Sequence, residues 1–224
     1  MIYVTGDIHA DMDRFKSKAI KRLKKNDTLI VCGDFGFVWD GSPKEQKQLK
    51  WLGKRHFNLL FIEGTHDNLE LLAQYPEVEY CGGKARQISG RCHQLLRGEI
   101  YNMESDQLFV FGGGESFDMD TRVSGETWWA NELPTQEEIA YARENLEKHG
   151  NVVDYIVTHQ ASSIVNSFLN MDSIHTNQLA AFFDEISQKV RYKHWFFGCY
   201  HTDKVIPPKH HIVYQEVLPL KAQL

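Results

Sequence analysis

The chain has 224 residues, 42% of them hydrophobic, and its 25 Lys and Arg against 30 Asp and Glu give a formal charge of −5. This composition excludes a disordered, collagen-like or coiled-coil chain, and the length is sufficient to bury a sizeable core without disulfides. The longest apolar runs last only a few residues, far below the roughly 20 that cross a bilayer, so we expect a soluble protein with no membrane partner.

Cysteine usage and the first residues both favour a cytoplasmic protein. Cys32, Cys81, Cys92 and Cys199 form neither a CxxC motif nor a dense framework, which indicates free thiols in a reducing compartment. The N-terminal residues have neither the basic segment nor the long apolar segment of an export signal. The basic cluster at residues 16–25 alternates with apolar residues, as is typical of a solvated helix face, so we do not expect long nucleic acid as a partner.

The first third of the chain predicts alternating strands and helices. Ile2–Thr5 and residues 27–32 are short β-branched runs that each lead into Gly-Asp, and apolar residues between them recur at helical spacing. A second helix is predicted over residues 43–55 after a Ser42 cap, and it leads to a strand at Asn58–Ile62. This alternation favours a parallel sheet, whose ligands collect beyond the carboxyl ends of the strands.

Further along, glycines interrupt residues 78–114, and we expect a meander or hairpins that form a second sheet. A long connection over residues 116–133 is followed by a helix over residues 134–148. The remaining predicted elements are a strand at 152–158, a helix at 177–190, a strand at 195–197 and a hairpin at 204–217. Because no repeat or linker divides the sequence, we predict a single domain over residues 1–224.

Side chains that bind metals or carry protons follow five predicted strands. They are Asp7 and His9, then Asp34, then His66 and Asp67, then His159, and finally His201. Asp and His donors suit divalent ions such as Mn, Fe or Zn. In a two-metal site, ions about 3.5 to 4 Å apart clamp a transferring phosphoryl group. A carboxylate shared between the ions holds them together, and Asp34 is the natural candidate.

The ordered motifs resemble those of the calcineurin-like metallophosphoesterases. The motifs are Gly6-Asp7-Ile8-His9, Gly33-Asp34, Gly64-Thr65-His66-Asp67, Thr158-His159 and Gly198-Cys199-Tyr200-His201. The stretch 113–118 with Arg122, and the pair Trp128-Trp129, look like a small bacterial and phage branch of that family. The resemblance covers nearly the whole chain. It implies an α/β fold in which two β-sheets form a sandwich flanked by helices, an α-β-β-α architecture with a dinuclear site at the strand ends.

The resemblance also implies a role for each site residue. The first metal would be bound by Asp7, His9, Asp34 and His201. Asp34 would bridge to the second metal, which His159 would also bind. His66 matches the family's histidine that protonates the leaving alkoxide or steadies the phosphate, and Asp67 would orient its imidazole. Two divalent ions, chosen from Mn, Fe, Zn or Ni, are therefore the expected cofactors.

Two positions of the second metal site depart from the family pattern. Thr65 stands where the family has Asn, and its hydroxyl is a poorer ligand with a shorter reach. Cys199 stands where the family has His; a thiolate could coordinate and would favour Zn, whereas a buried thiol would be inert. We therefore expect the second site to be weak, re-tuned or empty.

These features predict a metal-dependent phosphoesterase that hydrolyses phosphate mono- or diesters by direct attack of a metal-bound hydroxide, with Thr65 and Cys199 as the positions that could weaken it. The alternative is a catalytically impaired protein of the same fold, with one metal or none, that acts as a binding module or scaffold. Arg122 offers either a planar fork for a phosphate or a surface ion pair. The kind of phosphate ester stays open, because function must be argued from the pocket rather than from the fold.

Overall fold

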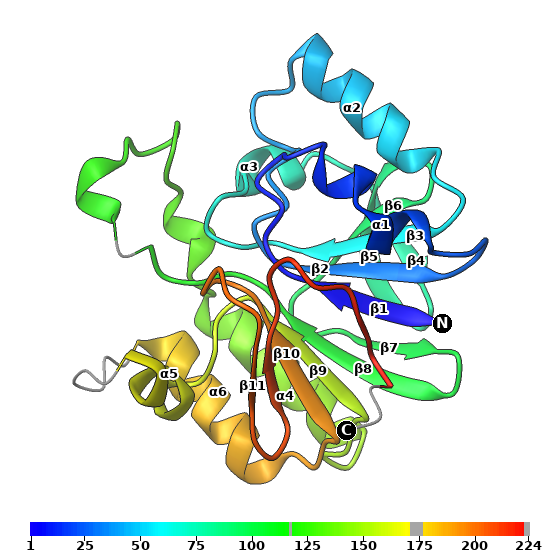
Figure 1. Ribbon diagram of the computed structural model, residues 1–224. Coiled ribbons are helices and arrows are strands. Elements are labelled where there is room, and N and C mark those ends of the chain that lie inside the picture. The colour runs from blue at the N-terminus through cyan, green and yellow to red at the C-terminus, as the bar shows by residue number, and fades with distance from the viewer. Residues whose placement is uncertain (117, 171–176, 222–224) are drawn as a thin grey trace.

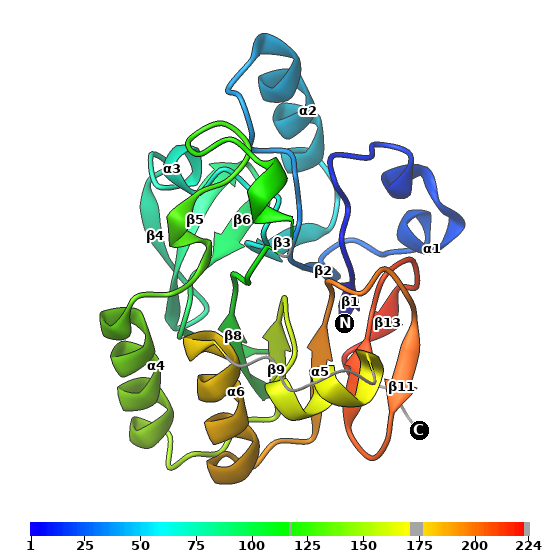
Figure 2. The same ribbon diagram turned by 90° about the vertical axis from the view of Figure 1, so that its left-hand side faces the viewer.

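The computed structural model describes residues 1–116, 118–170 and 177–221; Phe117, in the stretch 113–118 named above, lies outside them. Two mixed β-sheets face each other, and helices cover the outer face of each (Figure 1). Viewed from the side, α1, α2 and α3 lie beside the first sheet, whereas α4, α5 and α6 lie beside the second (Figure 2). The predicted α/β sandwich flanked by helices is therefore confirmed.

The first sheet has seven strands in the order β13-β1-β2-β3-β6-β5-β4. Its strands are β1 (Ile2–Thr5), β2 (Thr28–Cys32), β3 (Asn58–Ile62), β4 (Glu77–Tyr80), β5 (Gly83–Ser89), β6 (Cys92–Leu95) and β13 (Leu218–Pro219). Strands β1, β2, β3 and β6 run parallel, with Thr5 opposite Val31 and Cys32 opposite Ile62. The predicted parallel pairing of the first three strands is confirmed, and their carboxyl ends share one edge.

The second sheet has six strands in the order β11-β12-β10-β9-β8-β7. Its strands are β7 (Ile100–Met103), β8 (Asp106–Phe111), β9 (Tyr155–Thr158), β10 (His194–Phe197), β11 (Lys204–Ile206) and β12 (His210–Ile212). Strands β8, β9, β10 and β12 run parallel. The expectation that residues 78–114 form the second sheet is wrong for its first part. Strand β6 pairs with the otherwise free edge of β3, so β4, β5 and β6 extend the first sheet, and only β7 and β8 enter the second.

Side-chain caps define where most of the predicted helices begin. The helical elements are η1 (Arg14–Lys16), α1 (Lys18–Lys21), α2 (Pro43–Gly53), α3 (Leu69–Leu72), η2 (Met119–Thr121), η3 (Ala130–Glu132), α4 (Gln136–Lys148), α5 (Ser163–Asn170) and α6 (Gln178–Lys189). Ser42 caps α2, Thr135 forms a capping box with Glu138 at α4, and Asn177 caps α6. The helix expected between β1 and β2 is broken in two, because Ser17 is extended, ends η1 and caps α1.

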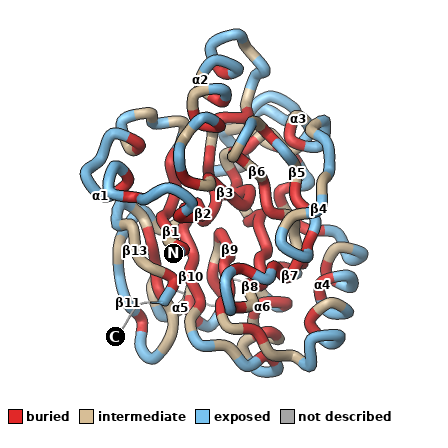
Figure 3. Tube along the Cα trace, turned by 90° about the vertical axis from the view of Figure 1, so that its right-hand side faces the viewer, coloured by how far each residue is buried: buried red, intermediate tan, exposed pale blue. Residues whose placement is uncertain are grey.

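Three apolar layers hold the sheets and helices together. In β2, Ile30 faces the layer between the sheets, whereas Leu29 and Val31 face the layer beneath α2. This alternation buries the strand on both faces, as parallel sheets between helices require. Phe182 and Phe183 of α6 pack against the outer face of the second sheet. Figure 3 shows the resulting buried strands inside exposed helical surfaces, so the strand ends are carried on a rigid scaffold.

Candidate metal centre

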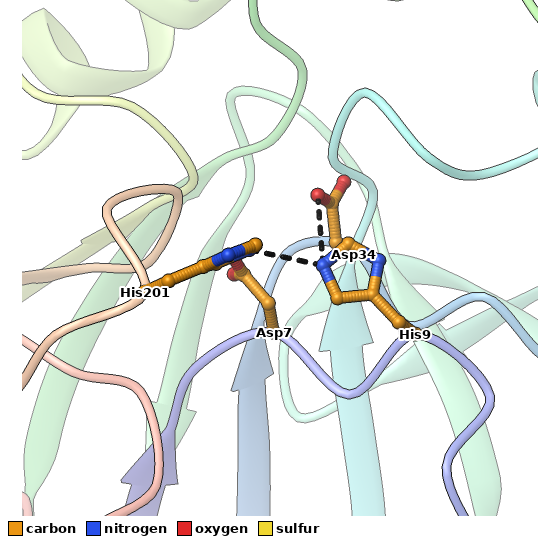
Figure 4. Close-up of side chains that lie close together, drawn as sticks. All are labelled: Asp7, His9, Asp34 and His201. Carbon is orange, nitrogen blue, oxygen red and sulfur yellow. Dashed lines mark hydrogen bonds and ion pairs between the residues drawn. The ribbon is translucent and has the colours of Figure 1, made fainter.

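The carboxyl ends of the parallel strands bring four predicted ligands together at one end of the sandwich. They are Asp7 and His9 after β1, Asp34 after β2 and His201 after β10, here called the four-ligand cluster. One ligand atom of each lies within 4.8 Å of the others. The His201 Nε2 atom is 3.0 Å from Asp7 Oδ2 and 3.1 Å from His9 Nε2. Figure 4 shows the four side chains converging, with Asp7 and His9 on the loop after β1 and Asp34 and His201 on two other loops.

The cluster has a buried acidic floor and an accessible imidazole rim. The side chains of Asp7 and Asp34 are 0% and 4% exposed, whereas those of His9 and His201 are 33% and 52% exposed. Two carboxylates so close together in a buried site repel each other unless a cation neutralises them. Their oxygens, combined with two imidazole nitrogens, form a donor set that suits Mn, Fe or Zn. The residues present therefore fit a divalent cation.

The backbone of the cluster is held in conformations that most residues avoid. His9, Asp34 and His201 have φ angles of 48°, 46° and 48°, in the left-handed region. Such positions cost of order 1 to 3 kcal/mol each and concentrate at functional sites. The adjoining glycine positions leave no room for a side chain: a Cβ atom at Gly64 would lie 2.1 Å from Asp34 Oδ1, and one at Gly198 would lie 2.3 Å from Asp7 Oδ1. The motif glycines therefore allow the carboxylates to lie where they do.

The two carboxylates have opposite electrostatic surroundings. Burial raises the pKa of Asp7, and the charge of Asp34 adds to this effect against the attraction of His159. For Asp34 burial also favours the neutral form, but His159 and His66 outweigh it and lower the pKa of that carboxyl. Asp34 Oδ1 additionally accepts a hydrogen bond from the His66 backbone N–H at 2.7 Å. Asp34 is thus held as an anion at the centre of the site.

Comparison with known proteins identifies the family. The family model described as calcineurin-like phosphoesterase matches residues 1–212. The chain belongs to this family. A similar solved structure is the phosphopantetheinyl hydrolase (PptH) from Mycobacterium tuberculosis, at 14% identity, over 96% of this chain and 89% of that one, with a TM-score of 0.45. The comparison with curated proteins finds no match.

Membership of the calcineurin-like phosphoesterases agrees with the resemblance expected from the motifs, and the family binds divalent metals. Among the described residues, no helix combines the length and the apolar character that crossing a membrane requires. The cytoplasmic location and the single-domain organisation stay predictions.

His159, predicted as a ligand of a second metal, lies beside Asp34. Its side chain is fully buried, and Nδ1 donates to the Cys32 carbonyl oxygen at 3.1 Å. The other ring nitrogen, Nε2, lies 3.5 Å from Asp34 Oδ1 and has no hydrogen-bond partner among the described residues. A metal-ligating His characteristically donates its second ring N–H to a carbonyl or carboxylate in this way. This orphaned nitrogen beside Asp34 therefore fits a second cation.

Thr65 and Cys199 lie beside this region but outside the four-ligand cluster. The Thr65 hydroxyl is 3.3 Å from His66 Nδ1. The Cys199 sulfur is 3.8 Å from Gln160 Nε2, and the Cys199 backbone N–H donates to both oxygens of Asp7 at 3.1 Å. Cys199 thus supports Asp7 through its backbone, whatever its thiol does. Their roles as metal ligands stay predictions.

His66 lies at the rim, but Asp67 does not orient its ring as expected. His66 Nδ1 lies 3.0 Å from Asp34 Oδ2, and the ring centroid is 5.0 Å from that of His9. The buried Asp67 carboxylate instead accepts three backbone N–H groups, from Phe35, Gly36 and Gly64. Burial and the charge of Asp34 raise the pKa of Asp67 to about 7, against these donors. The Asp67 carboxylate therefore binds the loops after β2 and β3, because their buried backbone N–H groups require an acceptor.

Arg122 lies in the site rather than on the open surface. Its side chain is only 8% exposed, and Nη1 donates to the Thr65 carbonyl oxygen at 3.0 Å. Nη2 lies 2.7 Å from His66 Nε2 and 2.8 Å from Asp118 Oδ1. The nearby Trp129 is buried and packs against Trp39 with ring centroids 5.1 Å apart, which anchors the loop. Arg122 therefore forms an ion pair, as one alternative expected, and also faces the centre, where a phosphate could reach its guanidinium.

Two supporting residues were not expected from the sequence. Arg14 donates to the Asp7 carbonyl oxygen at 2.9 Å and to the Tyr214 carbonyl oxygen. The Tyr214 ring stacks on His201 with centroids 5.0 Å apart. Arg14 and Tyr214 thus brace Asp7 and His201 from behind. Arg14 precedes a basic cluster that resembles a solvated helix face, so no sequence signal separates it from its neighbours.

Proposed function

We propose that this chain hydrolyses phosphate mono- or diesters with the help of two divalent ions. The observation that carries the proposal is the convergence of four Asp and His ligand atoms within 4.8 Å, in a member of the calcineurin-like phosphoesterases. The first ion would be held by Asp7, His9, Asp34 and His201. The second would be held by Asp34 and His159, with Thr65 and Cys199 as weaker candidates.

The residues around the centre support the remaining steps. When bound, divalent ions lower the pKa of water so that hydroxide attacks phosphorus directly, and they neutralise charge on the phosphoryl oxygens. His66 is 42% exposed and lies beside Asp34, so an entering ester can reach its ring. A proton carried by His66 Nε2 would pass to the leaving oxygen as its bond to phosphorus breaks. The buried floor holds Asp34 as an anion that can be shared between the ions.

Hydrolysis of aryl phosphates tests this proposal. Protein loaded with Mn²⁺ or Zn²⁺ is expected to hydrolyse p-nitrophenyl phosphate or its bis-ester. His66→Ala should lower kcat by roughly 10²- to 10⁴-fold, the usual contribution of a proton-transfer group, and Asp34→Ala should abolish turnover. His149→Gln, at the end of α4, is the matched control and should keep full activity. Equal rates for the loaded wild type and the Asp34→Ala variant on both esters would contradict the proposal.

Thr65 and Cys199 favour a second candidate, an impaired phosphoesterase fold that binds without turnover. Neither side chain belongs to the four-ligand cluster, so Asp34 and His159 would be the main ligands of the second ion. Elemental analysis of the purified protein separates the two functions. Two equivalents of metal support the enzyme, whereas one or none supports the binding module.

A further inference from the structure

Arg122 brings a guanidinium group to the edge of the candidate metal centre. The residue lies in the connection between β8 and α4, the long segment that has little regular structure of its own. Its contacts tie it to the loop after β3, through the Thr65 carbonyl oxygen and His66 Nε2. Arg122 is nearly buried there, whereas its partner Asp118 is 55% exposed. The side chain therefore points into the site and not along the surface.

The contact with His66 is unusual chemically. A guanidinium has only donors, so His66 Nε2 must act as the acceptor, and the ring proton lies on Nδ1, facing Asp34 Oδ2 at 3.0 Å. Guanidinium groups prefer oxyanions, to which they donate two parallel hydrogen bonds. A neutral imidazole nitrogen is a poor substitute, and a buried guanidinium needs compensation for its lost hydration. Arg122 pairs with Asp118 at its more exposed side. Toward the centre, it contacts no oxyanion among the described residues and donates instead to His66 Nε2.

The same contact keeps His66 from its proposed role. A general acid must carry its proton on the nitrogen that faces the leaving oxygen, and Arg122 Nη2 lies 2.7 Å from that nitrogen. A phosphoryl oxygen that enters between the two groups would accept from the guanidinium and leave Nε2 free. One anion would then satisfy Arg122 and release His66.

We propose that Arg122 binds the phosphoryl group of the substrate. Before substrate enters, His66 Nε2 accepts a hydrogen bond from the guanidinium, and the phosphoryl group displaces His66 from this contact. This inference rests on the proposed function and names a residue that determines substrate binding at the same site. It also places a fixed positive charge beside Thr65, next to the second-metal region in which the family's usual ligands are replaced. Arg122 would make phosphate binding less dependent on a strongly held second ion.

Binding of inorganic phosphate tests the inference without requiring turnover. Calorimetry on zinc-loaded protein should show the phosphate Kd rising about 10- to 100-fold in Arg122→Met, the usual effect of losing charge-assisted hydrogen bonds. Arg122→Lys should recover part of the affinity, since it restores the charge but not the fork. Arg143→Met, which removes a partly exposed ion pair between Arg143 of α4 and Glu185 of α6, is the matched control and should bind phosphate like the wild type. Metal content should be the same in all four proteins.

A second measurement reports on the displacement itself. In the imidazole ¹⁵N spectrum of the zinc-loaded wild type, phosphate should shift the His66 Nε2 resonance, and in Arg122→Met the resonance should already be shifted before phosphate is added. A phosphate Kd for Arg122→Met within about twofold of the wild-type value, at equal metal content, would overturn the inference. So would a His66 resonance that phosphate leaves unchanged in the wild type. If the wild type binds phosphate through Arg122 but hydrolyses no ester, the proposed function fails and the inference stands.

Discussion

Acidification is expected to destabilise the protein through histidines at the opposite end of β10 from the four-ligand cluster. His211 is 1% exposed, its Nε2 is 3.0 Å from His194 Nδ1, and its ring stacks on Phe196. Burial, followed by the charges of His194 and His210, lowers the pKa of His211 to about 4. Burial and Lys209 lower the pKa of His210 to about 4 as well.

The direction of the pH effect follows from these pKa values. The unfolded chain binds a proton at each imidazole near the ordinary value of 6.5, whereas the folded chain binds it only near 4. Stability is therefore complete above pH 6.5 and is lost as the pH falls toward 4. Between pH 7.5 and pH 5 the shift corresponds to at most about 2 kcal/mol per imidazole. We expect a loss of about 1 to 2 kcal/mol for each imidazole over this pH range.

Urea unfolding at pH 7.5 and pH 5 measures this loss. His211→Phe keeps a ring against Phe196 but removes the titration, so its loss on acidification should be smaller than that of the wild type by about 1 to 2 kcal/mol. The exposed His149→Gln variant should show the full wild-type loss. If His211→Phe loses as much stability as the wild type, the explanation through His211 is refuted.

Three further changes test how the site is held. Tyr214→Leu removes the ring stacked on His201 and should weaken Mn²⁺ binding by about 10-fold in calorimetry. Tyr214→Phe keeps the ring and should bind Mn²⁺ normally. Equal Mn²⁺ affinities of the two variants would show that the Tyr214 ring does not support His201. Asp67→Asn replaces one of the two accepting oxygens by an amide donor, so at least one of the three backbone N–H groups loses its acceptor. This should lower the free energy of unfolding in urea by about 1 to 3 kcal/mol, and a change below about 0.5 kcal/mol would contradict this explanation. Thr65→Asn combined with Cys199→His restores the residues that the family resemblance implies and should raise the metal content toward two equivalents by elemental analysis. A content that stays at one equivalent would contradict this expectation.

The parallel strands could be predicted because local and global signals agree in them. Ile2–Thr5 and Asn58–Ile62 are apolar on both faces and are bounded by loops, which is the pattern of strands buried between helices and a second sheet. The sheet to which β4, β5 and β6 belong could not be predicted. Their pairing depends on the free edge of β3, a long-range contact that leaves no periodic signal in the sequence. The break at Ser17 was equally hidden, since a cap and a helical residue can both be Ser.

The same contrast separates the ligands from the residues that support them. Asp7, Asp34 and His201 could be predicted to converge, because they follow parallel strands whose carboxyl ends lie at one end of the sandwich. Arg122 and Tyr214 lie in loops, where spacing does not determine direction. Asp67 shows the limit of the motif itself, because its place after His66 suggested an orienting role, whereas the buried N–H groups of two loops determine where its carboxylate lies.

The candidate centre also joins the two sheets. Asp7, His9 and Asp34 extend from the first sheet, whereas His159 and His201 extend from the second, so an ion held by both sets would link sheets that otherwise meet through an apolar layer. A metal that binds only the folded chain, at 100 times its Kd, stabilises it by about 2.7 kcal/mol. For a chain of this length this corresponds to a rise in Tm of roughly 5 to 10 °C. A chelator should therefore lower the Tm of the wild type by that amount and leave Asp34→Ala unchanged, with His149→Gln behaving as the wild type does. A wild-type Tm that stays constant while elemental analysis shows the metal removed would mean that the centre does not couple the sheets.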